Sequence, residues 1–384
     1  MPHRSLTGGW EDYRAEFPTC ERTTYLNTCS LGALSRRSRA AVQFFLDLWE
    51  EHGASAWYAT WLDEVAALRA DFERLVNAPA GSVAIHHSIS SALSVVASCY
   101  PYTGRNRIIT TALDFPTIPY QWLVKEGVEV ITLPSPDGIA VPIEAWAAAI
   151  DERTALVATS HVFFTSGYIQ PIAELAHLAH AAGAHIVVDG YQAAGQLPVD
   201  VAALHVDYYL AGGLKWLLGG PGIVELYVRP GLLPELRPSI TGWFAHGQQF
   251  RFDPESFAFS DDARRLELGT PAVAAVYAAR AGLDLLLEIG IPAIRAREQE
   301  LVDDLVARAR DAGLRVKLPA DRDQHAGILM FPAEDPASIV RALKAERIVV
   351  DYRPGHVRVS PYFYNTVDEH ALLIERLRTL IQAQ

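Results

Sequence analysis

Short apolar runs alternate with segments of helical period between about residues 80 and 230. Each run is continuous rather than alternating, which is typical of strands buried on both faces of a parallel sheet. The pattern predicts strands at Val83–His87, Arg107–Thr111, Val128–Leu133, Ala155–His161, His185–Asp189, Asp207–Leu210 and Ile223–Val228. Because helical segments separate most of these runs, we expect an α/β fold with a mostly parallel seven-stranded sheet between helices.

The pattern changes on both sides of this region. Residues 35–78 have helical period and are interrupted at Gly53, which predicts two helices. From Pro271 onward we predict helices at Ala272–Ile289 and Ile294–Ala312, strands at Leu314–Lys317, Ile328–Phe331, Ile348–Asp351 and Val357–Ser360, and a closing helix from Val367. We therefore expect a large domain at 31–270, a small C-terminal α+β domain at 271–384, and an N-terminal segment, 1–30, that packs near the small domain.

Composition and charge exclude several classes of protein. The chain has 384 residues, half of them hydrophobic, and a formal net charge of −12 without a basic cluster, which argues against nucleic-acid binding. No apolar stretch approaches the roughly 20 residues of a membrane span, and no signal-like segment opens the chain, so we expect a cytoplasmic protein without membrane contact. Cys20, Cys29 and Cys99 lack the spacing of a zinc site, so we expect reduced structural thiols and no metal.

Lys215 has an informative local context. It follows an apolar run and a glycine pair, and the glycine-rich turn Gly219-Gly-Pro-Gly222 separates it from the next apolar run. This pattern predicts a lone amine on a tight loop at the edge of the sheet. An aliphatic amine is a poor nucleophile until it is desolvated or converted to an imine. Lys215 is therefore a candidate Schiff-base lysine, and an ordinary loop lysine is the alternative.

Asp189 ends the predicted buried strand His185–Asp189 with a carboxylate. Ligand-binding groups of open α/β sheets lie at the carboxyl ends of strands. An anion there can keep the nitrogen of a pyridine ring protonated, so that the ring acts as an electron sink. A cap of the following helix is the alternative for Asp189. The occurrence of both Asp189 and Lys215 favours catalytic roles for the two residues.

Further motifs follow in a characteristic order. Asp189 and Lys215 precede Gly269-Thr270-Pro271 and the run Arg358-Val-Ser-Pro-Tyr-Phe-Tyr-Asn365-Thr366. Together these residues resemble the class V aminotransferase superfamily of pyridoxal-phosphate enzymes, which includes kynureninases, cysteine desulfurases and isopenicillin N epimerase-like proteins. The resemblance extends from Tyr25-Leu-Asn-Thr-Cys-Ser-Leu-Gly32 to the last helix. It implies fold type I, pyridoxal 5′-phosphate bound by the large domain, and an amino-acid substrate.

The resemblance also implies roles for individual cofactor-binding residues. The turn Ser88-Ile89-Ser90 would hold the cofactor phosphate, which suits the free N–H groups and hydroxyls of a helix N-terminus; a serine-rich N-cap is the alternative. Phe115 would stack on the pyridine face, although an isolated aromatic after a strand is often a core residue. Gln192 would donate to the phenolic oxygen of the cofactor. Thr270 would reach the phosphate from a neighbouring subunit, which implies a homodimer with shared active sites.

The same resemblance implies a substrate site. Arg358 matches the arginine that grips the substrate α-carboxylate with its guanidinium fork, and a structural ion pair is the alternative. Trp243 resembles a residue of a kynureninase segment that lines the substrate pocket; a surface aromatic is the alternative. Asn27, in the N-terminal motif, is a further candidate substrate ligand.

Several positions depart from the known branches. The stretch Asp351-Tyr-Arg-Pro-Gly-His-Val-Arg358 contains no cysteine, so a desulfurase that forms a persulfide on this stretch is disfavoured. Ile118, Gln192 and Leu214 stand where kynureninases have aspartate, histidine and tyrosine. Proton transfers would then fall to Lys215 itself or to another group, and Tyr191 and His246 are candidates. Ile118, Leu214 and Phe164 together suggest a less polar substrate pocket than in those branches.

These observations predict an enzyme that joins an L-α-amino acid to the cofactor as an imine and cleaves a C–S or C–C bond of the amino-acid side chain. Lys215 would be the Schiff base and proton shuttle. Transamination and epimerisation at Cα are alternatives, because bond cleavage, transamination and epimerisation all begin with loss of the Cα proton. A non-catalytic scaffold that retains the fold is a third possibility, which the presence of Lys215, Asp189 and Arg358 disfavours.

Overall fold

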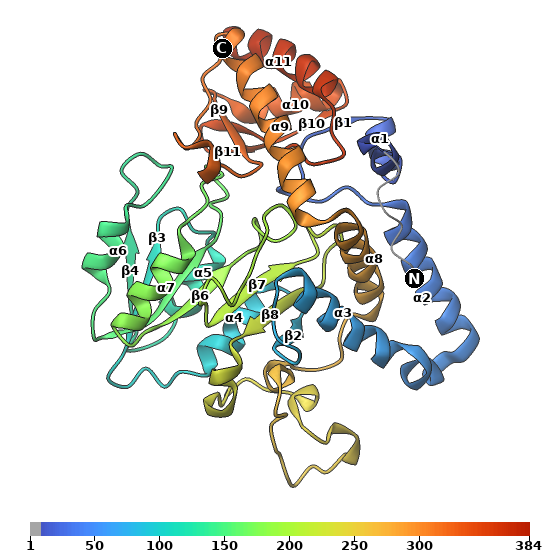
Figure 1. Ribbon diagram of the computed structural model, residues 1–384, viewed down its shortest axis with the longest axis vertical. Coiled ribbons are helices and arrows are strands. Elements are labelled where there is room, and N and C mark those ends of the chain that lie inside the picture. Colours follow the sequence, from blue (N-terminus) through green and yellow to red (C-terminus); the bar gives the residue numbers. More distant parts are fainter. Residues whose placement is uncertain (1–8) are drawn as a thin grey trace.

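The computed structural model describes residues 9–384 (Figure 1). Within these residues the strands form a seven-stranded sheet, a three-stranded sheet and a two-stranded pair. The seven-stranded sheet has the order β2-β8-β7-β6-β5-β3-β4, and β8 runs antiparallel to both of its neighbours. Its strands are β2 (Val83–His86), β3 (Arg107–Thr111), β4 (Glu129–Leu133), β5 (Thr154–Ser160), β6 (His185–Asp189), β7 (Tyr208–Gly212) and β8 (Val224–Val228). The predicted α/β fold with a mostly parallel seven-stranded sheet is confirmed.

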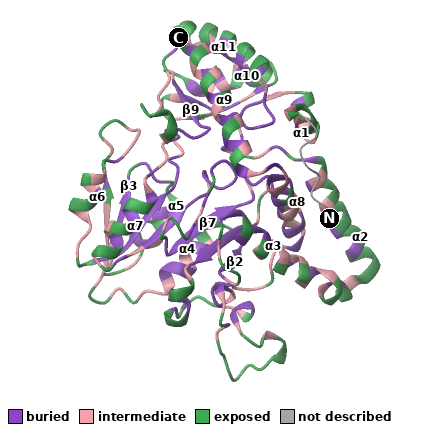
Figure 2. Ribbon diagram, viewed as in Figure 1, coloured by how far each residue is buried: buried purple, intermediate pink, exposed green. Residues whose placement is uncertain are grey.

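Helices cover both faces of this sheet, whose strands, apart from the edge strand β4, are almost entirely buried (Figure 2). One face packs against α3 (Leu62–Leu75), α6 (Ile143–Ala149), α7 (Ile172–Ala181) and α8 (Val273–Ile289). The other face packs against α4 (Ile89–Ser98) and α5 (Thr117–Leu123). The long helix α2 (Arg36–His52) lies against α8 at the outside of the molecule. The protein thus forms the three-layer arrangement that buries both faces of a parallel sheet.

A smaller sheet lies at the C-terminal end of the chain (Figure 1). It has the order β11-β12-β9, with antiparallel neighbours, and consists of β9 (Leu329–Pro332), β11 (Asp351–Arg353) and β12 (His356–Val359). Helices α9 (Ile291–Asp311), α10 (Pro336–Ala345) and α11 (Val367–Gln382) complete its hydrophobic core. The N-terminal strand β1 (Thr24–Tyr25) pairs in parallel with β10 (Ile348–Val349), so the start of the chain packs beside this sheet.

Shorter elements connect these parts. They are α1 (Trp10–Arg14), the π-helical turn η3 (Trp57–Trp61), and the 3₁₀ turns η1 (Pro18–Glu21), η2 (Gly53–Ser55), η4 (Pro230–Glu235), η5 (Trp243–Ala245), η6 (Gln249–Arg251), η7 (Ala263–Leu266) and η8 (Arg322–Gln324). The break at Gly53 is confirmed, and turns η2 and η3 separate α2 from α3. Among residues 9–384, no helix combines the length and the apolar character needed to cross a membrane.

Two predicted strands are wrong in detail. Leu314–Lys317 forms a single bridge, between Lys317 and Met330, rather than a strand. Pro319 follows almost at once and lacks the N–H that a longer ladder would need. Ile348–Asp351 is divided at Val350, because its first half pairs with β1 and its second half opens the β11–β12 hairpin.

Candidate active site

A cavity of about 350 Å³ opens at the carboxyl ends of strands β5 and β6. This edge of an α/β sheet is where ligands usually bind, and the volume is in the range of small-molecule sites. Its lining residues are His87, Ser88, Ile89, Ser90, Phe115, Thr117, Ser160, Val162, Phe164, Asp189, Tyr191, Gln192, Leu214, Lys215, Pro221 and Gly222. The structure thereby brings together seven predicted residues that are far apart in the sequence: Ser88, Ile89, Ser90, Phe115, Asp189, Gln192 and Lys215.

Lys215 stands on the loop that follows β7, and close backbone packing determines the course of this loop. The N–H of Gly32 donates to the carbonyl of Leu214 at 2.9 Å. A Cβ at Gly32 would overlap the carbonyl oxygen of Lys215, and one at Gly212 would overlap the ring of Tyr191. Glycine is needed at both positions because neighbouring atoms approach so closely. The Lys215 Nζ lies 4.8 Å from the centre of the Tyr191 ring.

The surroundings of Lys215 favour its neutral amine. Burial, with smaller contributions from the nearby Arg358 and Arg353, lowers the pKa of Lys215 to about 8, although Cys29 and Asp189 oppose the shift. Desolvation disfavours a charged ammonium, and like charges do the same. A larger fraction of Lys215 is therefore unprotonated near neutral pH than for an exposed lysine, which is the state that attacks a carbonyl.

Asp189 presents a buried carboxyl group to the same cavity. Its Oδ1 accepts a hydrogen bond from the N–H of Tyr191 at 2.8 Å. Burial raises the pKa of Asp189 to about 6 and the neighbouring Asp114 raises it too, while the Tyr191 amide and Lys215 oppose this. A proton is thus held more tightly here than by an exposed aspartate, which suits a carboxyl group that shares a proton with a ring nitrogen.

The N-terminus of α4 forms the opposite end of the cavity. Ser88 caps this helix by accepting from the N–H of Ser91 at 3.1 Å, and Ser91 Oγ accepts in turn from the N–H of Ser88. The Ser90 hydroxyl is hydrogen-bonded to that of Thr117 at 2.5 Å, at the start of α5. Free N–H groups, hydroxyls and the helix dipole together suit an anion such as a phosphate.

Aromatic and amide side chains complete the walls. Phe115 is 46% exposed, and its ring meets that of Phe164 edge to face at 5.3 Å between centres. A planar ligand ring would cover this exposed aromatic face. Gln192 Nε2 donates to the Cys29 carbonyl at 3.0 Å, and Gln192 Oε1 accepts from Trp216 Nε1 at 2.7 Å. Because an amide nitrogen carries two hydrogens, Gln192 Nε2 has a second N–H that its hydrogen bond to Cys29 does not use.

Arg358 lies behind the Phe164 side of the cavity and is almost fully buried. Its Nη1 donates to the Phe164 carbonyl at 3.1 Å, and its Nη2 forms an ion pair with Asp351 at 2.6 Å. The ion pair that we considered as an alternative is therefore present. The Arg358 Nε is also buried and has no hydrogen-bond partner within residues 9–384. That orphaned Nε–H, in a residue that influences the pKa of Lys215, is a donor that an anionic ligand could use.

Four predicted site residues do not line the cavity: Arg358, whose contact is with the Phe164 carbonyl, and three that lie elsewhere. Asn27 forms a backbone bridge with Ser360, Trp243 lies at the surface in η5, and Thr270 is exposed after η7. His246 likewise lines a different hollow, together with Trp243. Within one protomer, proton transfer by His246 is therefore not supported.

Sequence reasoning missed several residues of the site. Thr117 and Ser160 line the cavity; Thr117 begins α5, and Ser160 lies near the end of the predicted strand Ala155–His161. The position of Ser160 near the end of a predicted strand was a usable signal. Asp351 and its contact with Arg358 were missed because the contact depends on the register of a hairpin.

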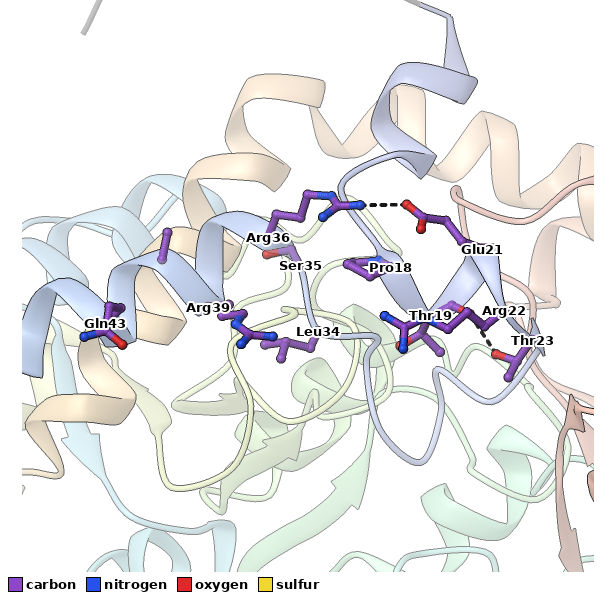
Figure 3. A pocket seen from close by; sticks show the side chains of 11 residues that line it. Pro18, Thr19, Glu21, Arg22, Thr23, Leu34, Ser35, Arg36, Arg39 and Gln43 are labelled. Carbon is purple, nitrogen blue, oxygen red and sulfur yellow. Dashed lines mark hydrogen bonds and ion pairs between the residues drawn. The ribbon is translucent and has the colours of Figure 1, made fainter.

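A larger hollow, of about 760 Å³, lies between η1 and the start of α2 (Figure 3). Arg22, Arg36 and Arg39 line it, and Arg36 forms an ion pair with Glu21 at 2.7 Å. Both partners of that pair are more than half exposed, so it contributes little energy. None of the predicted site residues lies there, and we assign the chemistry to the smaller cavity.

The geometry fits pyridoxal 5′-phosphate. An anion-binding helix end, a buried carboxyl group, an amine of lowered pKa and an exposed aromatic face surround one cavity. A family model described as Aminotransferase class-V matches residues 49–373. The protein belongs to the class V aminotransferase family. As a member of this family, it is a pyridoxal-phosphate-dependent enzyme.

Relatives of known name cover nearly the whole sequence. An "Uncharacterized aminotransferase YcbU" of Bacillus subtilis is 35% identical over 94% of this chain and 96% of its own. The isopenicillin N epimerase of Streptomyces clavuligerus is 31% identical over 97% of this chain and 98% of its own. A solved structure of a C-DES mutant, with glycine covalently linked to its PLP cofactor, superimposes with a TM-score of 0.88 at 22% identity. It covers 95% of this chain and 98% of its own. That structure supports the fold.

Proposed function

We propose that this class V enzyme removes the Cα proton of an L-α-amino acid with Lys215 and then cleaves a C–S or C–C bond of the amino-acid side chain. The observation that carries the proposal is that Lys215 and Asp189 line one cavity, while Arg358 contacts the backbone of its lining residue Phe164. A base, a ring-nitrogen partner and a carboxylate anchor are the groups that such a reaction needs.

Each residue has a defined task in this proposal. Arg358 binds the substrate α-carboxylate through its unpartnered Nε–H and so orients the Cα–H bond. The Lys215 amine would hold the cofactor through its aldehyde, and the free amine would accept the Cα proton and return it to the leaving group. Asp189 keeps the ring nitrogen protonated. When bound, pyridoxal phosphate supplies the electron sink that stabilises negative charge at Cα.

Transamination is the second candidate, since the relative with 35% identity is named an aminotransferase. Epimerisation has less support, although another relative is an epimerase. Inversion at Cα by two bases requires an acid–base group on each face. Among the described lining residues, Tyr191 lies beside Lys215, and Asp189 is assigned to the ring nitrogen. His87 and Tyr191 are therefore the residues of this lining to which a second base would fall.

Incubation with a panel of L-amino acids in deuterated water, followed by mass spectrometry, tests the proposal. Fragments of the side chain support the lyase reaction. A keto acid with aminated cofactor supports transamination, and exchange with inversion supports epimerisation. Lys215→Ala should abolish the lyase, transamination and epimerisation reactions. It should also abolish the visible absorption band of the cofactor bound to Lys215, which borohydride removes in the wild-type protein. Turnover by Lys215→Ala at the wild-type rate would contradict the assigned role.

We further infer a homodimer in which Thr270 and Trp243 reach the cavity of the partner. Both residues are exposed and lie outside the cavity of their own protomer. Large apolar side chains are also exposed on and after α2, with Phe44 54%, Trp49 55% and Tyr58 72% accessible. Exposed apolar groups of this extent mark association surfaces.

Complementation between inactive variants tests the shared site. A Lys215→Ala protein mixed with a Thr270→Trp protein should regain activity, because hybrid dimers contain one site with both native residues. Light scattering gives the oligomeric state. A monomer, or no recovery from confirmed hybrid dimers, would contradict the shared site.

A further inference from the structure

The hairpin β11–β12 places three charged residues on one face. Asp351 is directly opposite Arg358 in the antiparallel register, and Arg353 lies two residues beyond Asp351. Side chains at alternate positions of a strand, and those of directly paired residues, point to the same side. Asp351, Arg353 and Arg358 therefore share the face that contacts Ser30 and Phe164.

Asp351 is held by four hydrogen bonds. Its Oδ2 accepts from Arg358 Nη2 at 2.6 Å, Arg353 Nη1 at 2.9 Å and Ser30 Oγ at 2.5 Å. Its Oδ1 accepts from the N–H of Tyr352 at 2.7 Å. Burial raises the pKa of Asp351, but the Ser30 hydroxyl and the two guanidinium groups outweigh this and lower it overall. Asp351 is thus an ionised carboxylate that already accepts a hydrogen bond from each of the two guanidinium groups.

The net charge of Asp351, Arg353 and Arg358 matches a substrate with a single carboxylate. Two guanidinium groups share one aspartate, which leaves one net positive charge, and the buried Arg358 Nε is the vacant donor. One α-carboxylate neutralises that charge. A second carboxylate on the substrate side chain would lie near Asp351 without a cation of its own, and such juxtaposition of like charges costs several kcal/mol in general.

The rest of the wall offers no charged partner for a side chain. Of the described residues that line the cavity, only His87, Asp189 and Lys215 have acidic or basic side chains. Asp189 and Lys215 are occupied by the cofactor in the proposed function, and His87 adjoins the anion-binding end of α4. The other described lining residues are uncharged. Ile89, Phe115, Val162, Phe164 and Leu214 are apolar, and the Phe164 carbonyl contacts Arg358.

We propose that Asp351 is a specificity-determining residue, which restricts the substrate to α-amino acids with one carboxylate and a neutral, largely apolar side chain. This inference rests on the proposed function of the cavity. Asp351 acts as an internal carboxylate: it fills the place near Arg353 that the second carboxylate of an acidic amino acid would otherwise take.

The test compares L-glutamine with L-glutamate, which are alike in shape and differ in charge. Each is titrated into the cofactor-loaded protein, and the change of the visible absorption band gives the dissociation constant. We expect wild-type protein to bind L-glutamine at least about tenfold more tightly than L-glutamate, and L-methionine more tightly than either. This measurement needs no turnover and no variant.

Asp351→Asn then removes the charge and leaves the shape. We expect the preference for L-glutamine to fall at least about tenfold, because Arg353 becomes available to the second carboxylate. Asp351→Asn combined with Arg353→Gln should restore the preference. Asp311→Asn is the matched control, since this exposed aspartate at the end of α9 has the same charge and lies outside the cavity and the hairpin.

The possible results separate cleanly. Equal binding of both ligands by wild-type protein would overturn the inference. A uniform gain of affinity in Asp351→Asn, with an unchanged ratio, would also overturn it, since Asp351 would then merely compete with the α-carboxylate. A general loss of binding in that variant would mean a purely structural role. If no amino acid changed the band of wild-type protein, the proposed function would fail as well.

Discussion

Replacing Lys215 by methionine should stabilise the protein when it lacks the cofactor. The folded structure lowers the pKa of Lys215 from an ordinary value of 10.5 to about 8. Each pKa unit corresponds to about 1.4 kcal/mol, so the charged ammonium costs up to about 3 kcal/mol at neutral pH. Partial access of water to the side chain reduces this, and we expect about 2 kcal/mol. Methionine has a similar length, carries no charge and leaves no large cavity.

The pH dependence gives the sharper test. Between about pH 8 and pH 10.5, unfolded Lys215 binds a proton that the folded protein releases, so wild-type stability rises with pH relative to the variant. The advantage of Lys215→Met should therefore be complete below about pH 8 and should vanish above about pH 10.5.

Urea unfolding of both cofactor-free proteins between pH 7 and pH 10 measures this difference. Lys344→Met, on the exposed face of α10, is the control and should show no pH-dependent gain. A variant that is no more stable than wild type at pH 7, or a gain that is constant with pH, would refute the reasoning.

Three further substitutions test the walls of the cavity. Asp189→Asn should lower kcat at least about a hundredfold while the protein still binds the cofactor, and a wild-type kcat would contradict its role. Phe115→Ala should weaken cofactor binding about tenfold by equilibrium dialysis, because a stacking face is lost; unchanged binding would place Phe115 elsewhere. Phe164→Asn should weaken binding of L-methionine relative to L-glutamine in the spectroscopic titration, and an unchanged ratio would count against an apolar pocket for the substrate side chain.

Much of the large sheet could be predicted because its strands are buried on both faces. Val83–His87 and His185–Asp189 are continuous apolar runs. A strand that is buried on both faces can be recognised by such a run, even when its partner strands are not known. The residues that follow such runs then lie at one edge of the sheet, as Asp189 and Lys215 do. Local pattern was sufficient here because parallel strands present their carboxyl ends on the same side.

The small sheet was harder to predict because pairing there depends on distant residues. Ile348–Asp351 looks like one strand, but it contributes to two sheets, and β1 lies more than 300 residues away in the sequence. The turn Pro354-Gly355 connects β11 to β12. The register of these two strands, which sets Asp351 against Arg358, follows from turn geometry that composition alone does not specify.

The N-terminal segment 27–32 explains why the site could not be completed from motifs alone. Lys215 is presented by the large sheet and Arg358 by the small sheet, so the spacing of base and carboxylate anchor is a tertiary property. Segment 27–32 contacts both residues' surroundings. The N–H of Gly32 donates a hydrogen bond to the loop of Lys215, and Ser30 accepts a hydrogen bond from Arg358 Nη2 at 2.7 Å. A motif at the start of the sequence therefore supports a reaction whose chemical groups come from its middle and its end. Such a role leaves no trace in the residues themselves, because Ser30 acts through position rather than through reactivity.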